Sequence, residues 1–144
     1  MTTIVRTPIA RTPGIDTCLW LDTQAEAALE HYLDVFPGAV KGEITRYGAD
    51  AAKMGGKEPG SVLTASFRVG DRRFVLLNGG PQYTFSEATS FMIHCETQDE
   101  VDYYWARLSE GGAEGPCGWL KDRFGVSWQV VPTELYALVA DPDP

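Results

Sequence analysis

The chain has 144 residues, a net charge of −8 and a pI near 4.6, so it lacks the excess of Lys and Arg through which proteins bind nucleic acids and anionic membranes. Hydrophobic residues make up 44% and charged residues 22%, as in ordinary globular proteins. No apolar run reaches the roughly 18 residues that a membrane-spanning helix needs. The length predicts a single domain.

The N-terminal segment, residues 1–14, contains Pro8 and Pro13 and no hydrophobic periodicity. We expect an extended arm, either loose or laid on a neighbouring subunit. It has no apolar core typical of a signal peptide. Cys18, Cys95 and Cys117 have no metal-binding spacing, and we expect reduced thiols in a cytoplasmic protein.

Residues 15–81 form the first predicted unit. Apolar and polar residues alternate over 15–21, which predicts a strand. Thr23 and Glu26 have the spacing of a capping box, and Pro37-Gly38 ends the helix that follows. Three strands are expected at 40–47, 61–69 and 72–78, with a polar loop at 49–60 between the first two.

Residues 82–144 repeat this pattern. A strand at 89–95 leads to Thr97 and Glu100, a second capping box, and to an amphipathic helix that ends at Gly111-Gly112. The two box motifs begin 74 positions apart, at Asp22 and Glu96. The unit then closes with a β-hairpin over 117–132, turning near Gly125, and a short helix over 135–139.

The fold class is therefore α+β, with two βαβββ units forming one domain by duplication. Each helix covers one face of its sheet, so the helices lie on the outer faces. The other faces curl into a partly closed mixed sheet around a cavity. The alternation predicts the following ligand-binding lining for that cavity: Asp16, Cys18, Trp20, Thr64, Ser66, Val75, Leu77, Ser90, Met92, His94 and Gln129.

Five predictions concern particular side chains. His94 could act as a general base or could be a hydrogen-bonded wall residue, whereas His31 is expected at the surface. Cys18 is more easily explained as a small core residue than as a nucleophile. Gln129 could orient a ligand or be satisfied by a neighbour such as Ser90. The charges at 121–123 are expected at a solvated hairpin tip, with Asp122 bonding backbone amides.

The chain resembles the vicinal oxygen chelate superfamily, which includes glyoxalases, bleomycin-resistance proteins and extradiol dioxygenases. Within it, the closest resemblance is to the PhnB-like branch, often labelled 3-demethylubiquinone-9 3-methyltransferase. The resembling segments are 20–32, 36–37, 74–80 and 118–132, and the likeness extends over residues 15–141.

The resemblance implies where a metal would be held. Metal-binding members place ligands, usually His and Glu, at the positions of Asp16, Val75, Ser90 and Gln129. Only one of these is a carboxylate, which is a poor donor set for zinc, iron or nickel, so neither metal nor cofactor is predicted. The chain also lacks the alternating α/β series of a Rossmann-like domain that would bind S-adenosylmethionine.

Three hypotheses follow. The first is a metal-free, homodimeric protein that binds a small, partly aromatic molecule in its cavity. The second is an enzyme with His94 or Asp16 as acid or base, or with metal-assisted chemistry. The third is a structural or regulatory dimer whose cavity is filled by its own side chains.

Overall fold

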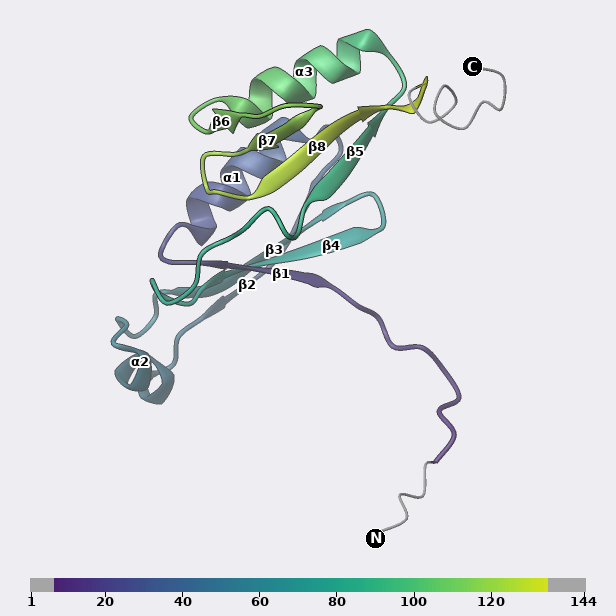
Figure 1. Ribbon diagram of the computed structural model, residues 1–144. Coiled ribbons are helices and arrows are strands. Elements are labelled where there is room, and N and C mark those ends of the chain that lie inside the picture. The colour runs from purple at the N-terminus through teal and green to yellow at the C-terminus, as the bar shows by residue number, and fades with distance from the viewer. Residues whose placement is uncertain (1–6, 135–144) are drawn as a thin grey trace, which may run out of the picture.

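The computed structural model describes residues 7–134 and contains two units of the same topology (Figure 1). The first unit consists of β1 (Thr17–Leu21), α1 (Ala25–Val35), β2 (Val40–Arg46), α2 (Ala49–Gly55), β3 (Val62–Val69) and β4 (Arg72–Asn78). The second consists of β5 (Phe91–Cys95), α3 (Gln98–Ser109), β6 (Ala113–Glu114), β7 (Trp119–Lys121) and β8 (Ser127–Pro132). The helix predicted at 135–139 lies outside the described residues.

Each unit builds one mixed four-stranded sheet. The strand orders are β1-β4-β3-β2 and β5-β8-β7-β6, called here sheet A and sheet B. The first strand of each unit runs parallel to the last, and the other neighbours are antiparallel. The predicted α+β fold with two βαβββ units is confirmed.

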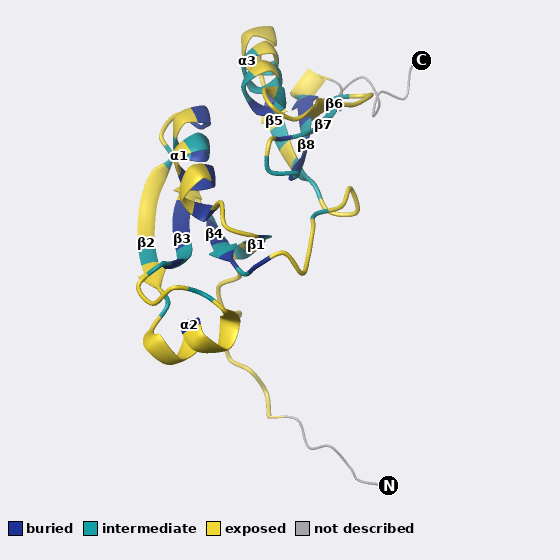
Figure 2. Ribbon diagram, turned by 90° about the vertical axis from the view of Figure 1, so that its left-hand side faces the viewer, coloured by how far each residue is buried: buried dark blue, intermediate teal, exposed yellow. Residues whose placement is uncertain are grey.

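One hydrophobic core serves both units, as the buried segments in Figure 2 indicate. Phe74 of sheet A contacts Phe91 of sheet B at 5.4 Å between ring centroids. Tyr32 of α1 lies 5.5 Å from Phe67 in sheet A and 5.9 Å from Trp128 in sheet B. The helix-bearing faces thus meet at a shared core, and the outer, helix-free faces of the two sheets point away from it.

The two helices begin differently. Thr97 caps α3, because its hydroxyl accepts a hydrogen bond from the Glu100 amide, as the capping box predicts. The box predicted at Thr23 is wrong: α1 begins after Gln24 without a side-chain cap of its own. Instead Asn78, at the end of β4, accepts a hydrogen bond of 2.8 Å from the Ala25 amide. A residue distant in sequence has replaced the local cap.

The segment predicted as a polar loop at 49–60 contains the short helix α2. Its Ala-rich sequence favours a helix once a partner is available, and Ala52 is fully buried. Gly56 ends the helix in the left-handed conformation, with φ of 67°.

The hairpin predicted at 117–132 is confirmed, with Gly125 at a φ of 88°. Of the three charges predicted at a solvated tip, Lys121 and Arg123 are at least partly exposed, but Asp122 is buried. Asp122 is 2% exposed. Its carboxylate accepts hydrogen bonds from the Tyr32 hydroxyl and the Trp128 indole, at 2.5 and 2.8 Å. It also accepts bonds from the Phe124 and Val126 amides, the turn role expected of it. The carboxylate therefore joins α1 to the hairpin.

His31 was expected at the surface but is half-buried, because α1 packs against the hairpin. Its ring lies 5.8 Å from that of Phe124, and its Nε2 is buried without a hydrogen-bond partner among the described residues. Burial, and then the Arg123 cation, lower the pKa of His31.

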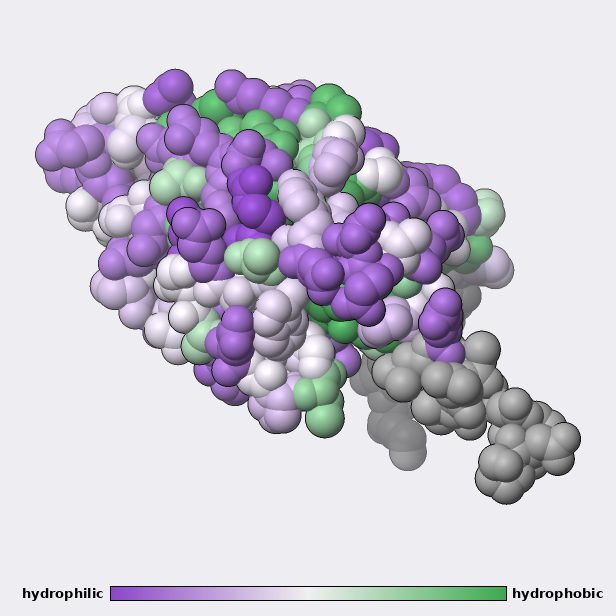
Figure 3. Space-filling model, turned by 90° about the horizontal axis from the view of Figure 1, so that it is seen from above, coloured by the Kyte–Doolittle hydropathy of each residue, from purple (hydrophilic) through white to green (hydrophobic). Residues whose placement is uncertain are grey.

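No helix among residues 7–134 is long and apolar enough to cross a membrane. Seen from above, hydrophilic side chains cover much of the surface, with smaller hydrophobic areas between them (Figure 3). Residues 7–14 of the predicted arm are exposed and contain neither helix nor strand.

Candidate functional site

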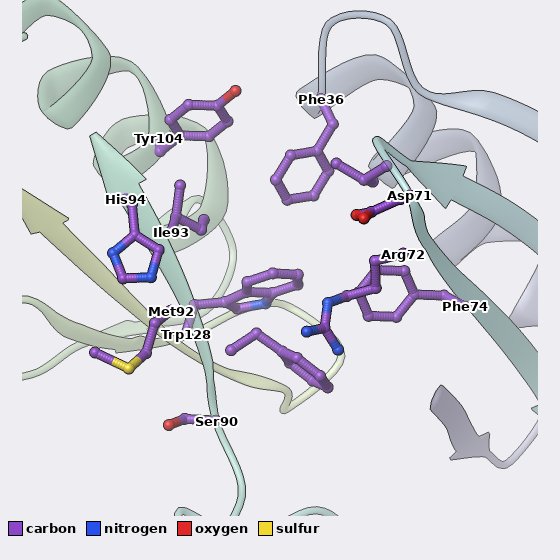
Figure 4. Close-up of a pocket in the computed structure, with 12 residues that line it drawn as sticks. Phe36, Asp71, Arg72, Phe74, Ser90, Met92, Ile93, His94, Tyr104 and Trp128 are labelled. Carbon is purple, nitrogen blue, oxygen red and sulfur yellow. The ribbon is translucent and has the colours of Figure 1, made fainter. Parts of the chain in front are cut away.

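A cavity with a volume of about 590 Å³ lies between the two units (Figure 4). We call it the inter-unit cavity. The turn between β3 and β4 forms one side and strand β5 the other, while α3 and the residue that ends α1 close the top. It is lined by Phe36, Val69, Asp71, Arg72, Phe74, Ser90, Phe91, Met92, Ile93, His94, Tyr104 and Trp128.

Aromatic rings from both units form its walls. Phe36 lies 5.6 Å from Tyr104 in a stacked arrangement and 5.4 Å from Trp128. Phe91 lies 5.3 Å from Trp128. The two Phe36 contacts hold rings of the two units against each other, and the Phe91–Trp128 contact lies within sheet B. The walls are therefore largely preformed, as small-molecule sites usually are.

The polar groups of the cavity come mainly from the β3–β4 turn. Figure 4 shows Asp71 and Arg72 directed from that turn toward the aromatic walls. Arg72 offers guanidinium N–H donors and Asp71 carboxylate acceptors. Burial raises the pKa of Tyr104, with further contributions from Tyr103, Cys95 and Glu100. Its hydroxyl therefore stays protonated at neutral pH and can donate a hydrogen bond.

Three residues of the predicted lining also line this cavity: Ser90, Met92 and His94. Side chains alternate along a strand, and Figure 4 shows Met92 and His94 on the other side of β5 from Ile93. They therefore lie at the rim. The sequence missed the inner wall because its aromatic residues share the helix-packing phase and were assigned to the core.

The outer face of sheet A carries most of the remaining predicted lining. The register places Cys18, Val75 and Ser66 in one row across three strands. Trp20, Leu77 and Thr64 form the next row. These residues share a face, as the alternation predicts.

The polar groups of this face have partners within sheet A. Asp16 forms an ion pair with Arg73. The hydroxyls of Thr64 and Thr45 share a hydrogen bond of 2.6 Å, and Ser66 accepts one from the Glu43 amide.

Cys18 lines a smaller cleft of about 290 Å³ beside Phe85. Burial raises the pKa of the Cys18 thiol. The thiol therefore stays protonated near neutral pH and is a weak nucleophile.

Gln129 lies on the outer face of sheet B, where its amide donates a hydrogen bond of 2.9 Å to the Ser90 hydroxyl. This is the satisfied amide that the sequence left as one of two alternatives. The Gln129 carbonyl oxygen still offers an acceptor on this face.

The residues at the superfamily's metal positions do not fit a metal. Within residues 7–134 no group of three or more His, Cys, Asp and Glu side chains could hold a metal ion. Asp16 is engaged by Arg73 on sheet A, whereas Gln129 and Ser90 bond each other on sheet B. Val75 offers no donor atom. The four positions supply neither a convergent nor a metal-preferring donor set.

Gly79 and Gly80, which follow β4, do not form a nucleotide-binding loop. The Trp20 indole donates a hydrogen bond of 2.9 Å to the Gly80 carbonyl. A Cβ atom on Gly79 would lie 2.3 Å from the same indole. Gly79 is therefore needed for the close approach of Trp20. The residues present do not fit S-adenosylmethionine at this turn.

Comparison with known proteins is consistent with this topology. The family model of 3-demethylubiquinone-9 3-methyltransferase matches residues 13–131. The chain belongs to this family. It is thereby a PhnB-like member of the vicinal oxygen chelate superfamily, as the sequence resemblance indicated.

Solved structures support the fold. The PhnB protein from Bacillus cereus has 28% sequence identity and a TM-score of 0.70, with 84% of this chain and 100% of that chain covered. Protein PA1353 from Pseudomonas aeruginosa has 20% identity and a TM-score of 0.66, covering 84% and 98%. The fosfomycin resistance protein FosX from Mesorhizobium loti has 11% identity and a TM-score of 0.60, covering 93% and 100%. No curated protein matches this chain.

Proposed function

We propose that this PhnB-like protein binds a small aromatic molecule, without a metal, in the inter-unit cavity. The observation that carries the proposal is the convergence of five aromatic side chains on one cavity of about 590 Å³: Phe36, Phe74, Phe91, Tyr104 and Trp128. A planar ring can stack on such walls at little cost in conformational entropy.

Arg72 supplies the polar anchor. Its side chain is directed into the cavity, whereas the next residue, Arg73, turns to the other face and pairs with Asp16. A hydroxyl or carbonyl on the ligand would accept hydrogen bonds from the guanidinium group, and the guanidinium plane can also lie over an aromatic ring. Ser90 and His94 at the rim add two further polar groups.

A neutral probe tests this proposal. 2-Naphthol titrated into the protein should shift the indole N–H resonance of Trp128 in NMR spectra. Tyr104→Ala removes a wall and should weaken binding about tenfold. Arg72→Gln should weaken it less, and Arg73→Gln is the matched control because it changes the neighbouring cation on the opposite face. Equal binding by Tyr104→Ala and the unmodified chain would rule out the cavity.

We further propose a homodimer located in the cytoplasm. Ile15, which precedes the edge strand β1, is 87% exposed, and Met92, on the edge strand β5, is 45% exposed. Because the outer faces of sheets A and B point away from the shared core, they can enclose one cavity only if two copies associate. The single cavity that the sequence predicts, with its eleven lining residues, could therefore form only in a dimer. Light scattering after gel filtration tests it, and a monomer at all concentrations contradicts it.

A further inference from the structure

A second cleft, of about 530 Å³, lies on the outer face of sheet B, away from the inter-unit cavity. The segment that joins the two units contributes Glu87 to its edge. Strands β6, β7 and β8 and the loop between β6 and β7 contribute the rest. It is lined by Glu87, Ala113, Glu114, Gly115, Pro116, Trp119, Leu120, Lys121 and Ser127.

Two cross-strand pairs organise this cleft. Lys121 lies opposite Ser127 and Trp119 lies opposite Gln129 in the antiparallel register of β7 and β8. Opposite residues project from the same face with their Cβ atoms about 5 Å apart. The Lys121 and Ser127 side chains therefore leave the sheet side by side, and the Trp119 side chain leaves it on the same face.

The Ser127 hydroxyl is an unusual feature of the cleft. Ser127 is 2% exposed, and its oxygen has no hydrogen-bond partner among the described residues. A buried hydroxyl without a partner is unfavourable by about 1–3 kcal/mol, so such groups are rare without a reason. A ligand acceptor in the cleft would supply the missing partner.

Lys121 is the single cation of this lining and is already engaged by a carboxylate, because it forms an ion pair with Glu87. The Lys121 side chain is 44% exposed and that of Glu87 61% exposed. An exposed pair of this kind contributes little to stability, so another carboxylate can replace Glu87 at small cost. The other acid of the lining, Glu114, accepts a hydrogen bond from the Trp105 indole.

We propose that this cleft binds the carboxylate of a small molecule with a flat apolar body. The Lys121 ammonium and the Ser127 hydroxyl bind the carboxylate, and Trp119 packs against the body. Glu87 occupies the anion position in the free protein and competes with the ligand. The joining segment thereby lowers the affinity of a site that is independent of the inter-unit cavity.

The test compares 2-naphthoate with 2-naphthamide, which has nearly the same shape but no charge. Glu87→Gln removes the competitor and should raise naphthoate affinity about fivefold while naphthamide affinity stays constant. Lys121→Gln should abolish the preference for naphthoate. Ser127→Ala should weaken the binding of both probes, since either probe can accept a hydrogen bond from the Ser127 hydroxyl.

Glu58→Gln is the matched control, because it removes one exposed acid far from the cleft and gives the same net charge. The indole N–H resonance of Trp119 should shift on naphthoate binding. Unchanged naphthoate affinity in Glu87→Gln, an equal gain for naphthamide, or a shift confined to Trp128 would each overturn the proposal. The last outcome would also assign naphthoate to the inter-unit cavity, so the two sites are distinguished.

Discussion

At the scale of single residues, Asp122 shows how the charged hairpin motif is used. A carboxylate can be buried when hydrogen bonds to its charged form replace water, and Asp122 accepts four of them. Two donors are backbone amides of its own turn, which sequence reasoning expected. The other two, Tyr32 and Trp128, come from α1 and β8, and local spacing gives no signal for them.

Asp122→Asn should therefore destabilise the protein strongly. The amide would place an N–H₂ group against the Tyr32 hydroxyl or the Trp128 indole and leave a buried donor unsatisfied. We expect a loss of about 2–4 kcal/mol in the free energy of unfolding, measured by urea denaturation. Asp71→Asn, at the exposed β3–β4 turn, should change it by less than about 0.5 kcal/mol. Similar losses in both variants would contradict this role.

Tyr32 should make stability sensitive to alkaline pH. Burial raises the pKa of Tyr32 well above its usual value, and the Asp122 carboxylate acts in the same direction. The stabilisation is fully present below about pH 10, where unfolded tyrosine begins to ionise, and is lost as the pH rises further. Tyr32→Phe should be less stable at pH 8 but lose less stability between pH 9 and 11. An equally steep loss would exclude Tyr32 as the cause.

His31 should act at the opposite end of the pH range. Because its pKa is lowered in the folded protein, protonation favours the unfolded state. Its contribution to stability is present above about pH 6.5 and decreases as the pH falls below that value. His31→Gln should show a smaller loss of stability between pH 7.5 and 5.5 in urea denaturation. No difference in slope would mean that its Nε2 is accessible to water.

At the scale of elements, the two helix starts separate what local sequence determines from what it does not. Both carry a Thr-x-x-Glu motif, and only Thr97 caps its helix. In the first motif Asn78 from β4 accepts from the Ala25 amide and donates to the Glu26 carboxylate, the side chain that a capping box would use. Local chemistry thus predicted the helices themselves, whereas the cap of α1 depended on a contact across 53 residues.

The two threonines form a matched pair for measurement. Thr97→Ala should reduce the free energy of unfolding by about 1 kcal/mol, because the Glu100 amide loses its acceptor. Thr23→Ala should change the free energy of unfolding by only a few tenths of a kcal/mol. Asn78→Ala removes the cap of α1 and should reduce the free energy of unfolding more than either threonine substitution. Equal effects for the two threonine variants would mean that the Thr23 hydroxyl does cap α1 in solution.

At the scale of the whole molecule, hydrophobic periodicity predicted which residues share a face, but not how the two sheets face each other. That orientation is fixed by contacts between units, such as Phe36 with Tyr104 and Arg107 with Asp34. Those contacts join residues of different repeats, and a period of two or 3.6 contains no information about them. The duplication and the βαβββ order of each unit were therefore predictable, whereas the inter-unit cavity was not.

The most direct test of the account is the position of bound 2-naphthol, followed through the indole N–H resonances of Trp128 and Trp119 in the unmodified protein and in Tyr104→Ala. The account predicts a saturable shift at Trp128 that weakens about tenfold in Tyr104→Ala and persists in Arg73→Gln. Saturable binding with no change at Trp128, or with the same affinity in Tyr104→Ala, would contradict ligand binding in the inter-unit cavity.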